Sequence, residues 1–221
     1  MSKVTLIYPG VETNVEQVIA TATNLSYSKK DISEILERFE VEDNISDLFA
    51  RSIGHGHWSV AEHVSFTFLI EDISLPCGEQ ILRHRTGKYT KQSYRYQKAT
   101  MEAVVPPSIN KKDFSYFTYK NAVDAAYDAY RRLIEQGIPK EDARFVIPTG
   151  TKCRMMMTID ARNLISFINH RACNEAQWEV RGVAIKMLNH LRKVAPNLAK
   201  YTKPVCENCT CSLKLNSKET K

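Results

Sequence analysis

The residues from Arg83 to Tyr96 gather most of the side chains in this chain that could bind an anion. Guanidinium and ammonium groups alternate with hydroxyl groups and one imidazole, and such groups donate hydrogen bonds to phosphate or carboxylate oxygens. A stretch of this composition can also be a solvated basic surface helix, and the stretch alone leaves that alternative open. The tyrosines and hydroxyl groups between the charges favour a binding site.

A helix is expected to carry the first half of this stretch, with Ser74 as its N-cap. If the helix continues to Gly87, then Gln80, Arg83 and His84 share one face, because positions three and four residues apart are neighbours. The glycine would end the helix. The residues after it are predicted to form a loop of hydrogen-bond donors: Lys88, Thr90, Lys91, Ser93 and Arg95.

A second group of polar residues lies between positions 55 and 63. His57, Glu62 and His63 are candidate metal ligands, but their spacing differs from that of a helical H-E-x-x-H motif. The favoured interpretation is that His57 and Ser59 hydrogen-bond a ligand while Glu62 orients the loop. The alternating residues 64–70 predict a strand directly after this group. Since the helix with Gln80 begins just beyond that strand, one shared site is expected.

The rest of the chain alternates predicted strands and helices. A strand is predicted at residues 4–8, and a buried strand or core segment at residues 155–159. Helices are predicted at residues 14–24, 31–39, 44–53, 108–136, 140–146, 160–171 and 176–194. In the long helix after residue 108, an apolar stripe from Phe114 and Phe117 to Leu133 is expected to face the core. Arg144 lies near the end of a short helix, where a cation also favours the helix dipole.

The helix expected at residues 160–171 begins with Asp160, a good N-cap. Arg162, Ser166 and Asn169 form its polar stripe. Arg171 is different because it lies four residues after Phe167, on the apolar side. An arginine there must extend its charge to solvent or meet an acidic or carbonyl-bearing partner.

Composition favours one folded, cytoplasmic domain. The 221 residues are 43% hydrophobic and 25% charged, which is typical of globular proteins, and no run approaches the ~20 apolar residues of a membrane helix. We expect a single domain over residues 1–200 and a polar, cysteine-containing tail over residues 201–221. The net charge of +6 is modest, and without a nucleic-acid-binding motif it indicates a small phosphorylated substrate rather than nucleic acid.

Six cysteines in a chain without a signal peptide are expected to be thiols or metal ligands. Cys77, Cys153 and Cys173 are dispersed and are interpreted as core residues. The remaining three, Cys206, Cys209 and Cys211, form C-x2-C-x-C in the tail. Three thiols lack the fourth ligand of a structural zinc site. A zinc site and a reduced tail therefore remain alternative interpretations of this motif, and no metal is assigned.

Several blocks together resemble the flavin-dependent thymidylate synthases. Their signature is R-H-R, seven residues and S, commonly followed by x-R-Y, and residues 83–96 fit it. Residues 57–68 resemble the segment H-x-[ST]-x-x-E-H-x-x-F-T-F. Further matches are Gln80, Ala143-Arg144 with Pro148, and the run from Asn169 through the block A-Q-W-E-[IV]-R at residues 176–181. The resemblance covers about residues 4–195.

The resemblance implies an α/β (α+β) fold, with a central, mostly antiparallel sheet flanked by helices, assembled as a homotetramer with shared sites. It also implies reductive methylation of dUMP to dTMP. The carbon donor would be 5,10-methylenetetrahydrofolate, the hydride carrier FAD and the reductant NADPH. Alternatives are a methylase of the same fold that acts on UMP, and a catalytically silent protein that binds flavin or nucleotide.

Residue by residue, the matching positions imply two groups of contacts. The residues expected at FAD are Ser59, Arg83, His84, Arg85, Thr86, Lys91, Asp160, Arg162 and Ser166. Those expected at dUMP are Gln80, Arg83, Lys91, Gln92, Ser93, Arg95, Arg144 and Arg171. Arg171, the implied catalytic residue, would engage the uracil carbonyl and N3 and favour the ionised ring.

The chain departs from the family pattern at several of these positions. Lys88, Thr90 and Lys91 stand where the signature usually has serine, asparagine or serine, and glutamate or glutamine. Asp160 and Ser166 stand where asparagines are common. Lys91 makes the loop more positive and should tighten anion binding. These departures leave the identity of the nucleotide open.

Overall fold

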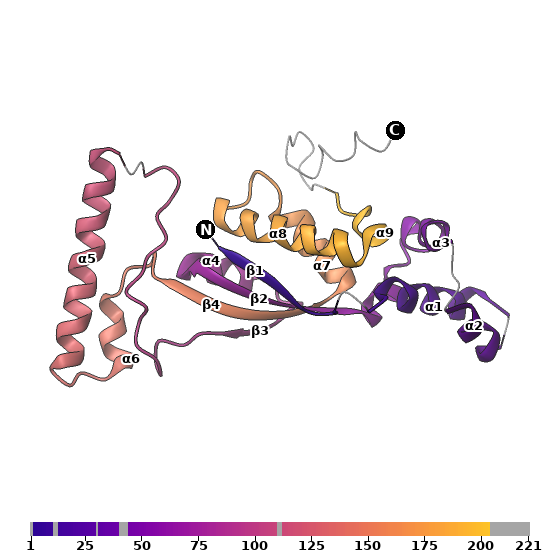
Figure 1. Cartoon of the computed structure of the whole chain (residues 1–221), viewed down its shortest axis with the longest axis horizontal. Coiled ribbons are helices and arrows are strands. Elements are labelled where there is room, and N and C mark those ends of the chain that lie inside the picture. Colours follow the sequence, from indigo (N-terminus) through magenta and orange to yellow (C-terminus); the bar gives the residue numbers. More distant parts are fainter. Residues whose placement is uncertain (1, 11–12, 30, 40–43, 110–111, 204–221) are drawn as a thin grey trace. The chain divides into compact units, whose positions relative to one another are not determined.

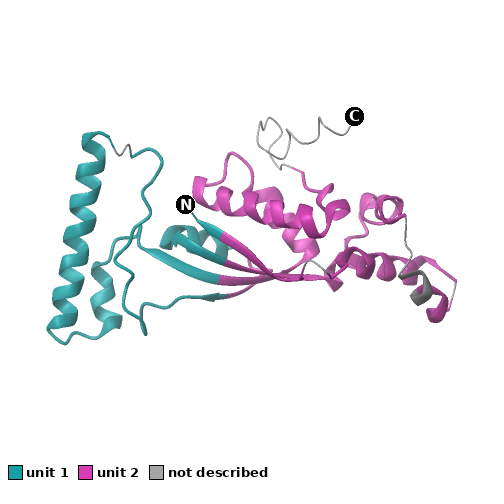
Figure 2. Cartoon of the chain, in the orientation of Figure 1, with its two compact units in different colours: residues 1–3, 70–83, 90–155 teal, residues 4–69, 84–89, 156–221 magenta. Residues whose placement is uncertain are grey.

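The computed structural model of the chain describes residues 2–10, 13–29, 31–39, 44–109 and 112–203. Two compact units are distinguished in Figure 2. Unit 1 consists of residues 1–3, 70–83 and 90–155, and unit 2 of residues 4–69, 84–89 and 156–221. The single domain expected over residues 1–200 and the separate tail stay predictions.

A four-stranded antiparallel sheet carries the fold (Figure 1). Its strands are β1 (Lys3–Tyr8), β2 (Ser65–Ser74), β3 (Lys88–Lys91) and β4 (Lys152–Asp160), in the order β1-β2-β4-β3. Alternate residues of β2 are buried, including Phe66, Phe68 and Ile70, because successive side chains point to opposite faces of a strand. Together with the flanking helices, this sheet confirms the predicted fold class.

Most predicted helices are present. The α-helices are α1 (Val15–Tyr27), α2 (Ile32–Phe39), α3 (Ile45–Arg51), α4 (Leu75–Leu82), α5 (Phe114–Glu135), α6 (Lys140–Ala143), α7 (Ala161–Arg171), α8 (Trp178–Val194) and α9 (Pro196–Ala199). Short 3-10 helices cover Ile53–His55, Trp58–His63 and Arg144–Val146. Ser74 caps α4 as predicted, by accepting a hydrogen bond of 3.2 Å from the Cys77 amide.

The predicted helix through Arg83 and His84 is wrong at its end. Helix α4 ends at Leu82, so His84 does not share a helical face with Gln80. The expected loop is also partly wrong, since Lys88–Lys91 form strand β3. Gly87 has a different role from ending a helix: a Cβ atom there would lie 2.5 Å from the Tyr89 hydroxyl oxygen.

The predicted apolar stripe of α5 is likewise wrong. Phe114 and Phe117 are 83% and 60% exposed, whereas Tyr127 and Tyr130 are buried. The Tyr127 hydroxyl lies 3.1 Å from the Thr151 hydroxyl, and the Tyr130 hydroxyl accepts a hydrogen bond of 3.2 Å from the Ala99 amide. Tyr127 and Tyr130 therefore define the buried face of α5, because each ring is buried while its hydroxyl group keeps a hydrogen-bond partner.

The dispersed cysteines are buried, as predicted. Cys77 and Cys153 are free thiols. Cys173 is disulfide-bonded, which contradicts the expectation of a thiol. The three cysteines of the tail motif lie outside the described residues. Within the described part of the chain, every helix is too short or too polar to span a lipid bilayer.

Candidate active site

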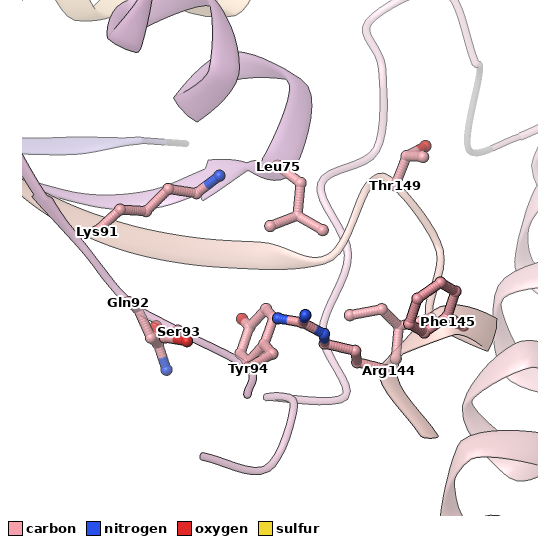
Figure 3. A pocket seen from close by; sticks show the side chains of 9 residues that line it. Leu75, Lys91, Gln92, Ser93, Tyr94, Arg144, Phe145 and Thr149 are labelled. Atoms are coloured by element: carbon pink, nitrogen blue, oxygen red, sulfur yellow. The ribbon is translucent and has the colours of Figure 1, made fainter. Parts of the chain in front are cut away.

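A pocket in unit 1 brings four of the predicted nucleotide-binding residues together (Figure 3). Its volume is about 480 Å³. The lining consists of Leu75, Lys91, Gln92, Ser93, Tyr94, Arg144, Phe145, Ile147 and Thr149. Cationic, amide and hydroxyl groups meet an aromatic and aliphatic wall, which suits a ligand with an anionic end and an apolar ring.

Arg144 supplies one positive charge to this pocket. It begins the 3-10 helix that follows α6, and the buried side chain of Ala143 fixes that turn. The Arg144 Nε atom donates a hydrogen bond of 3.0 Å to the Glu141 carbonyl oxygen. Figure 3 shows its guanidinium directed toward Tyr94. A carbonyl oxygen does not neutralise the guanidinium. The contact therefore orients the Arg144 side chain, and its positive charge stays available to bind an anionic ligand.

Lys91 supplies the second positive charge, and it is held by α4. Its Nζ atom lies 2.6 Å from Glu79 Oε1, and its side chain is 17% exposed. Gly78 makes room for the lysine, since a Cβ atom there would lie 3.1 Å from Lys91 Cε. The departure from the family signature at position 91 is thus accompanied by a carboxylate that attracts the new charge.

Replacing Lys91 with methionine is expected to weaken binding of a nucleotide monophosphate by about three- to tenfold. A partly exposed ammonium near a phosphate contributes on the order of 1 kcal/mol. The measurement is isothermal titration with dUMP and, as the matched ligand without phosphate, deoxyuridine. Lys193, in the last turn of α8, provides the control Lys193→Met. Equal loss of affinity for both ligands would show that Lys91 does not act on the phosphate.

Tyr94 is one of the five described residues of this pocket that were not predicted as ligand contacts; the others are Leu75, Phe145, Ile147 and Thr149. It is 5% exposed, and its hydroxyl donates a hydrogen bond to the Lys152 carbonyl oxygen. Burial raises the pKa of this tyrosine, so it remains a neutral donor.

Three other predicted nucleotide contacts lie elsewhere in unit 1. Gln80 is half-buried on α4, and Arg83 is its exposed C-cap. Arg95 pairs with Glu141, at 2.7 Å between Nε and Oε2, and its guanidinium lies 5.4 Å from the centre of the Tyr96 ring. None of these three is among the described residues that line the pocket.

His84 and Arg171 belong to unit 2. The ring of His84 meets Phe167 of α7 edge-on, with 5.3 Å between ring centres. Burial lowers the pKa of His84 and the positive charge of Arg171 adds to this, while a hydrogen bond with the Asn163 backbone opposes it. The imidazole is therefore neutral at pH 7. Its Nε2 atom is buried and has no hydrogen-bond partner among the residues that the structure describes.

Arg171 is the last residue of α7, and its Nε atom is buried. Its charge also acts on Tyr89, where it opposes the larger effect of burial that raises the pKa of that tyrosine to about 12. The position on the apolar side of α7 agrees with the pattern in the sequence. Arg171 as a whole is half-buried, and a guanidinium whose charge acts on a neutral imidazole and a tyrosine can donate to an oxygen that gains negative charge.

The other predicted cofactor residues also lie in unit 2, and three of them, Asp160, Arg162 and Ser166, cap or belong to α7. Arg162 pairs with Glu62, at 2.5 Å between NH1 and Oε1, and exposed Ser59 lies in the same 3-10 helix as Glu62. Asp160 uses its carboxylate locally, since Oδ1 accepts the Asn163 amide at 2.9 Å. Ser166 is half-buried, and Arg85 and Thr86 are exposed in the turn after α4.

Glu62 forms an ion pair with Arg162. Among the residues that the structure describes, no cluster of three histidine, cysteine, aspartate or glutamate side chains could hold a metal ion. The alternative of His57, Glu62 and His63 as ligands finds no support in this arrangement.

Comparison with known proteins decides the family. Residues 11–197 match the family described as thymidylate synthase complementing protein. The chain belongs to this family. Thymidylate synthase complementing proteins with similar sequences include the flavin-dependent thymidylate synthase of Saccharolobus solfataricus, which is 42% identical over 194 residues, 86% of this chain and 74% of the relative. That of Geobacter sulfurreducens is 37% identical over 89% of this chain and 85% of the relative.

A solved structure shows the same fold. It is the crystal structure of a UMP/dUMP methylase, PolB from Streptomyces cacaoi, bound with 5-Br dUMP. The TM-score is 0.77 at 23% sequence identity, and the match covers 90% of this chain and 94% of the other. The family and fold predicted from the sequence blocks are therefore confirmed.

Proposed function

We propose that this protein converts dUMP to dTMP, with 5,10-methylenetetrahydrofolate as carbon donor, FAD as hydride carrier and NADPH as reductant. The observation that carries the proposal is the pocket with Lys91, Ser93 and Arg144 in a chain of this family. The charge of Arg144, the Ser93 hydroxyl and Lys91, whose charge is shared with Glu79, suit a phosphate. The pocket of about 480 Å³ has room for a nucleoside.

The chemistry balances without a protein nucleophile. C5 of uracil becomes bonded to the methylene carbon of the folate, the C5 proton is lost to solvent, and the bond between that carbon and the folate nitrogen breaks. A hydride then completes the methyl group. Because that hydride comes from NADPH, the folate leaves as tetrahydrofolate. Arg171, by its match to the family's sequence blocks, is the residue we assign to the uracil carbonyl, where a donor would stabilise the negative charge that C5 needs to attack, as preorganised donors do in other enzymes.

The residues of unit 2 fit a flavin. When bound, FAD supplies hydride transfer. Arg85, Thr86 and Arg162 offer exposed donors for its diphosphate, and the buried Nε2 atom of neutral His84 offers a partner for a polar ring atom. Asp160 and Ser166 sit at the start and the middle of α7, where their local hydrogen bonds keep the helix in place.

The proposed assembly is a cytoplasmic homotetramer with sites shared between subunits, without nucleic acid or membrane partners. Its support is the exposure of large aromatic side chains in unit 1: Phe114 and Phe145 are each 83% exposed, and Phe117 is 60% exposed. Exposed apolar side chains of this size are typical of protein interfaces. Sedimentation velocity measures the assembly directly, and a monomer at micromolar concentration would contradict it.

UMP is the second candidate substrate, because the protein with the similar structure is named a UMP/dUMP methylase. The test incubates purified protein with FAD, NADPH and methylenetetrahydrofolate and either nucleotide, followed by chromatography of the products. Formation of dTMP from dUMP supports the proposal, and a methylated product from UMP alone would replace it with the second candidate. No product from either nucleotide, in a protein that holds FAD, would indicate the silent flavoprotein.

A further inference from the structure

Tyr89 is a residue that neither the motifs nor the pocket singled out, although it contacts the turn that follows α4. Its hydroxyl donates a hydrogen bond of 2.5 Å to the carbonyl oxygen of His84. The same carbonyl accepts the Gly87 amide at 3.3 Å. The backbone of His84 is thus held from two sides, by a main-chain turn and by a side chain of β3.

Gly87 allows the ring of Tyr89 to reach this position. A Cβ atom at residue 87 would lie 2.5 Å from the Tyr89 hydroxyl oxygen and 2.6 Å from its Cζ atom, far inside van der Waals contact. The glycine therefore serves the close approach of the tyrosine. Burial raises the pKa of Tyr89 to about 12, so the hydroxyl keeps its proton and remains a donor at any ordinary pH.

Tyr89 also lies near the charge of Arg171, which acts on its pKa as it does on that of His84. The tyrosine is consequently close to the two functional side chains of unit 2 without being a motif residue itself. The turn buries His84 Nε2 and sets the His84 ring edge-on to Phe167, while the neighbouring Arg85 and Thr86 are exposed, and the Tyr89 hydrogen bond holds the backbone at His84 itself.

We propose that Tyr89 is a positioning residue: its hydrogen bond to the His84 carbonyl, made possible by Gly87, holds the Arg83-His84-Arg85 turn in the shape that binds the flavin. The inference rests on the proposed function, because it assigns that turn to FAD. It predicts that losing one hydroxyl group, at a residue outside the predicted cofactor contacts, weakens cofactor binding.

The test measures the dissociation constant of FAD by flavin fluorescence in wild-type protein and in the Tyr89→Phe variant. We expect a three- to tenfold weaker affinity, about the value of one hydrogen bond, together with a shift of the bound flavin absorption bands. Tyr8→Phe is the matched control, because Tyr8 is 53% exposed in β1. A merely structural tyrosine would lower the melting temperature but leave the affinity and the spectrum unchanged.

A second variant keeps the test decisive. Gly87→Ala should displace the tyrosine ring and weaken FAD binding by about tenfold, and the double variant Gly87→Ala/Tyr89→Phe should bind FAD no more weakly than Gly87→Ala alone. Unchanged FAD affinity in Tyr89→Phe, or additive losses in the double variant, would overturn the inference while leaving the proposed function intact. A wild-type protein that binds no FAD would overturn both.

Discussion

Arg171→Ala protein is expected to keep its flavin and to form dTMP about 10²–10³ times more slowly than the wild type. A donor that stabilises developing charge in a water-poor site contributes roughly 3–4 kcal/mol to the transition state. Arg171 is suited to this because its Nε atom is buried at the end of α7, beside a neutral imidazole. Turnover is measured by dTMP formation, and flavin content by absorbance of the purified protein.

Two further variants separate charge from packing at this position. Arg171→Lys keeps the charge but loses the planar pair of donors, and it should recover only part of the rate. Arg192→Ala removes an arginine from the last turn of α8, where NH1 donates to Asn189, and should leave turnover unchanged. Loss of flavin from Arg171→Ala would show that the residue holds the cofactor rather than polarising the nucleotide.

Arg144→Ala is expected to weaken dUMP binding by about 10- to 100-fold and to leave FAD bound. A hydrogen bond to a charged group contributes about 1.5–3 kcal/mol. The guanidinium of Arg144 lines the pocket, and its contact with the Glu141 carbonyl leaves its charge in place. Isothermal titration measures the affinity for dUMP and, as the ligand without phosphate, for deoxyuridine.

The variant Arg131→Ala is the matched control for Arg144. Arg131 lies in the same unit on α5, where NH1 is 3.0 Å from Asp128 Oδ1 and the side chain is 58% exposed. Its replacement should change neither affinity. If Arg144→Ala weakened deoxyuridine as much as dUMP, the arginine would contact the nucleoside, and the phosphate would have to bind elsewhere.

Periodicity correctly predicted the elements in which the spacing of apolar residues along the chain decides which side chains are buried. The alternation in β2 and the Asp160 cap of α7 are local features, and both were placed correctly. The position of Arg171 on the apolar side of α7 could also be predicted, because it follows from the spacing between Phe167 and Arg171 alone. Composition and order of motifs then identified the family without any contact between distant residues.

Other features depend on partners that no local pattern contains. The end of α4 at Leu82 and the strand at Lys88–Lys91 follow from the pairing of β3 in the sheet, which competes with a helical turn. Glu79 meets Lys91 across the fold, although they lie apart in the sequence. On α5 the buried face is the one with Tyr127 and Tyr130, whose hydroxyl groups form hydrogen bonds, and not the face with Phe114 and Phe117 that was expected. Hydrogen bonding decided each of these cases.

The most direct test of the account is one anaerobic turnover with chemically reduced, flavin-loaded protein, dUMP and methylenetetrahydrofolate. If this chain passes hydride from the flavin to the nucleotide, one dTMP and one tetrahydrofolate form for each flavin that becomes oxidised. Persistence of the reduced flavin spectrum without dTMP, or formation of dihydrofolate in place of tetrahydrofolate, would contradict the account.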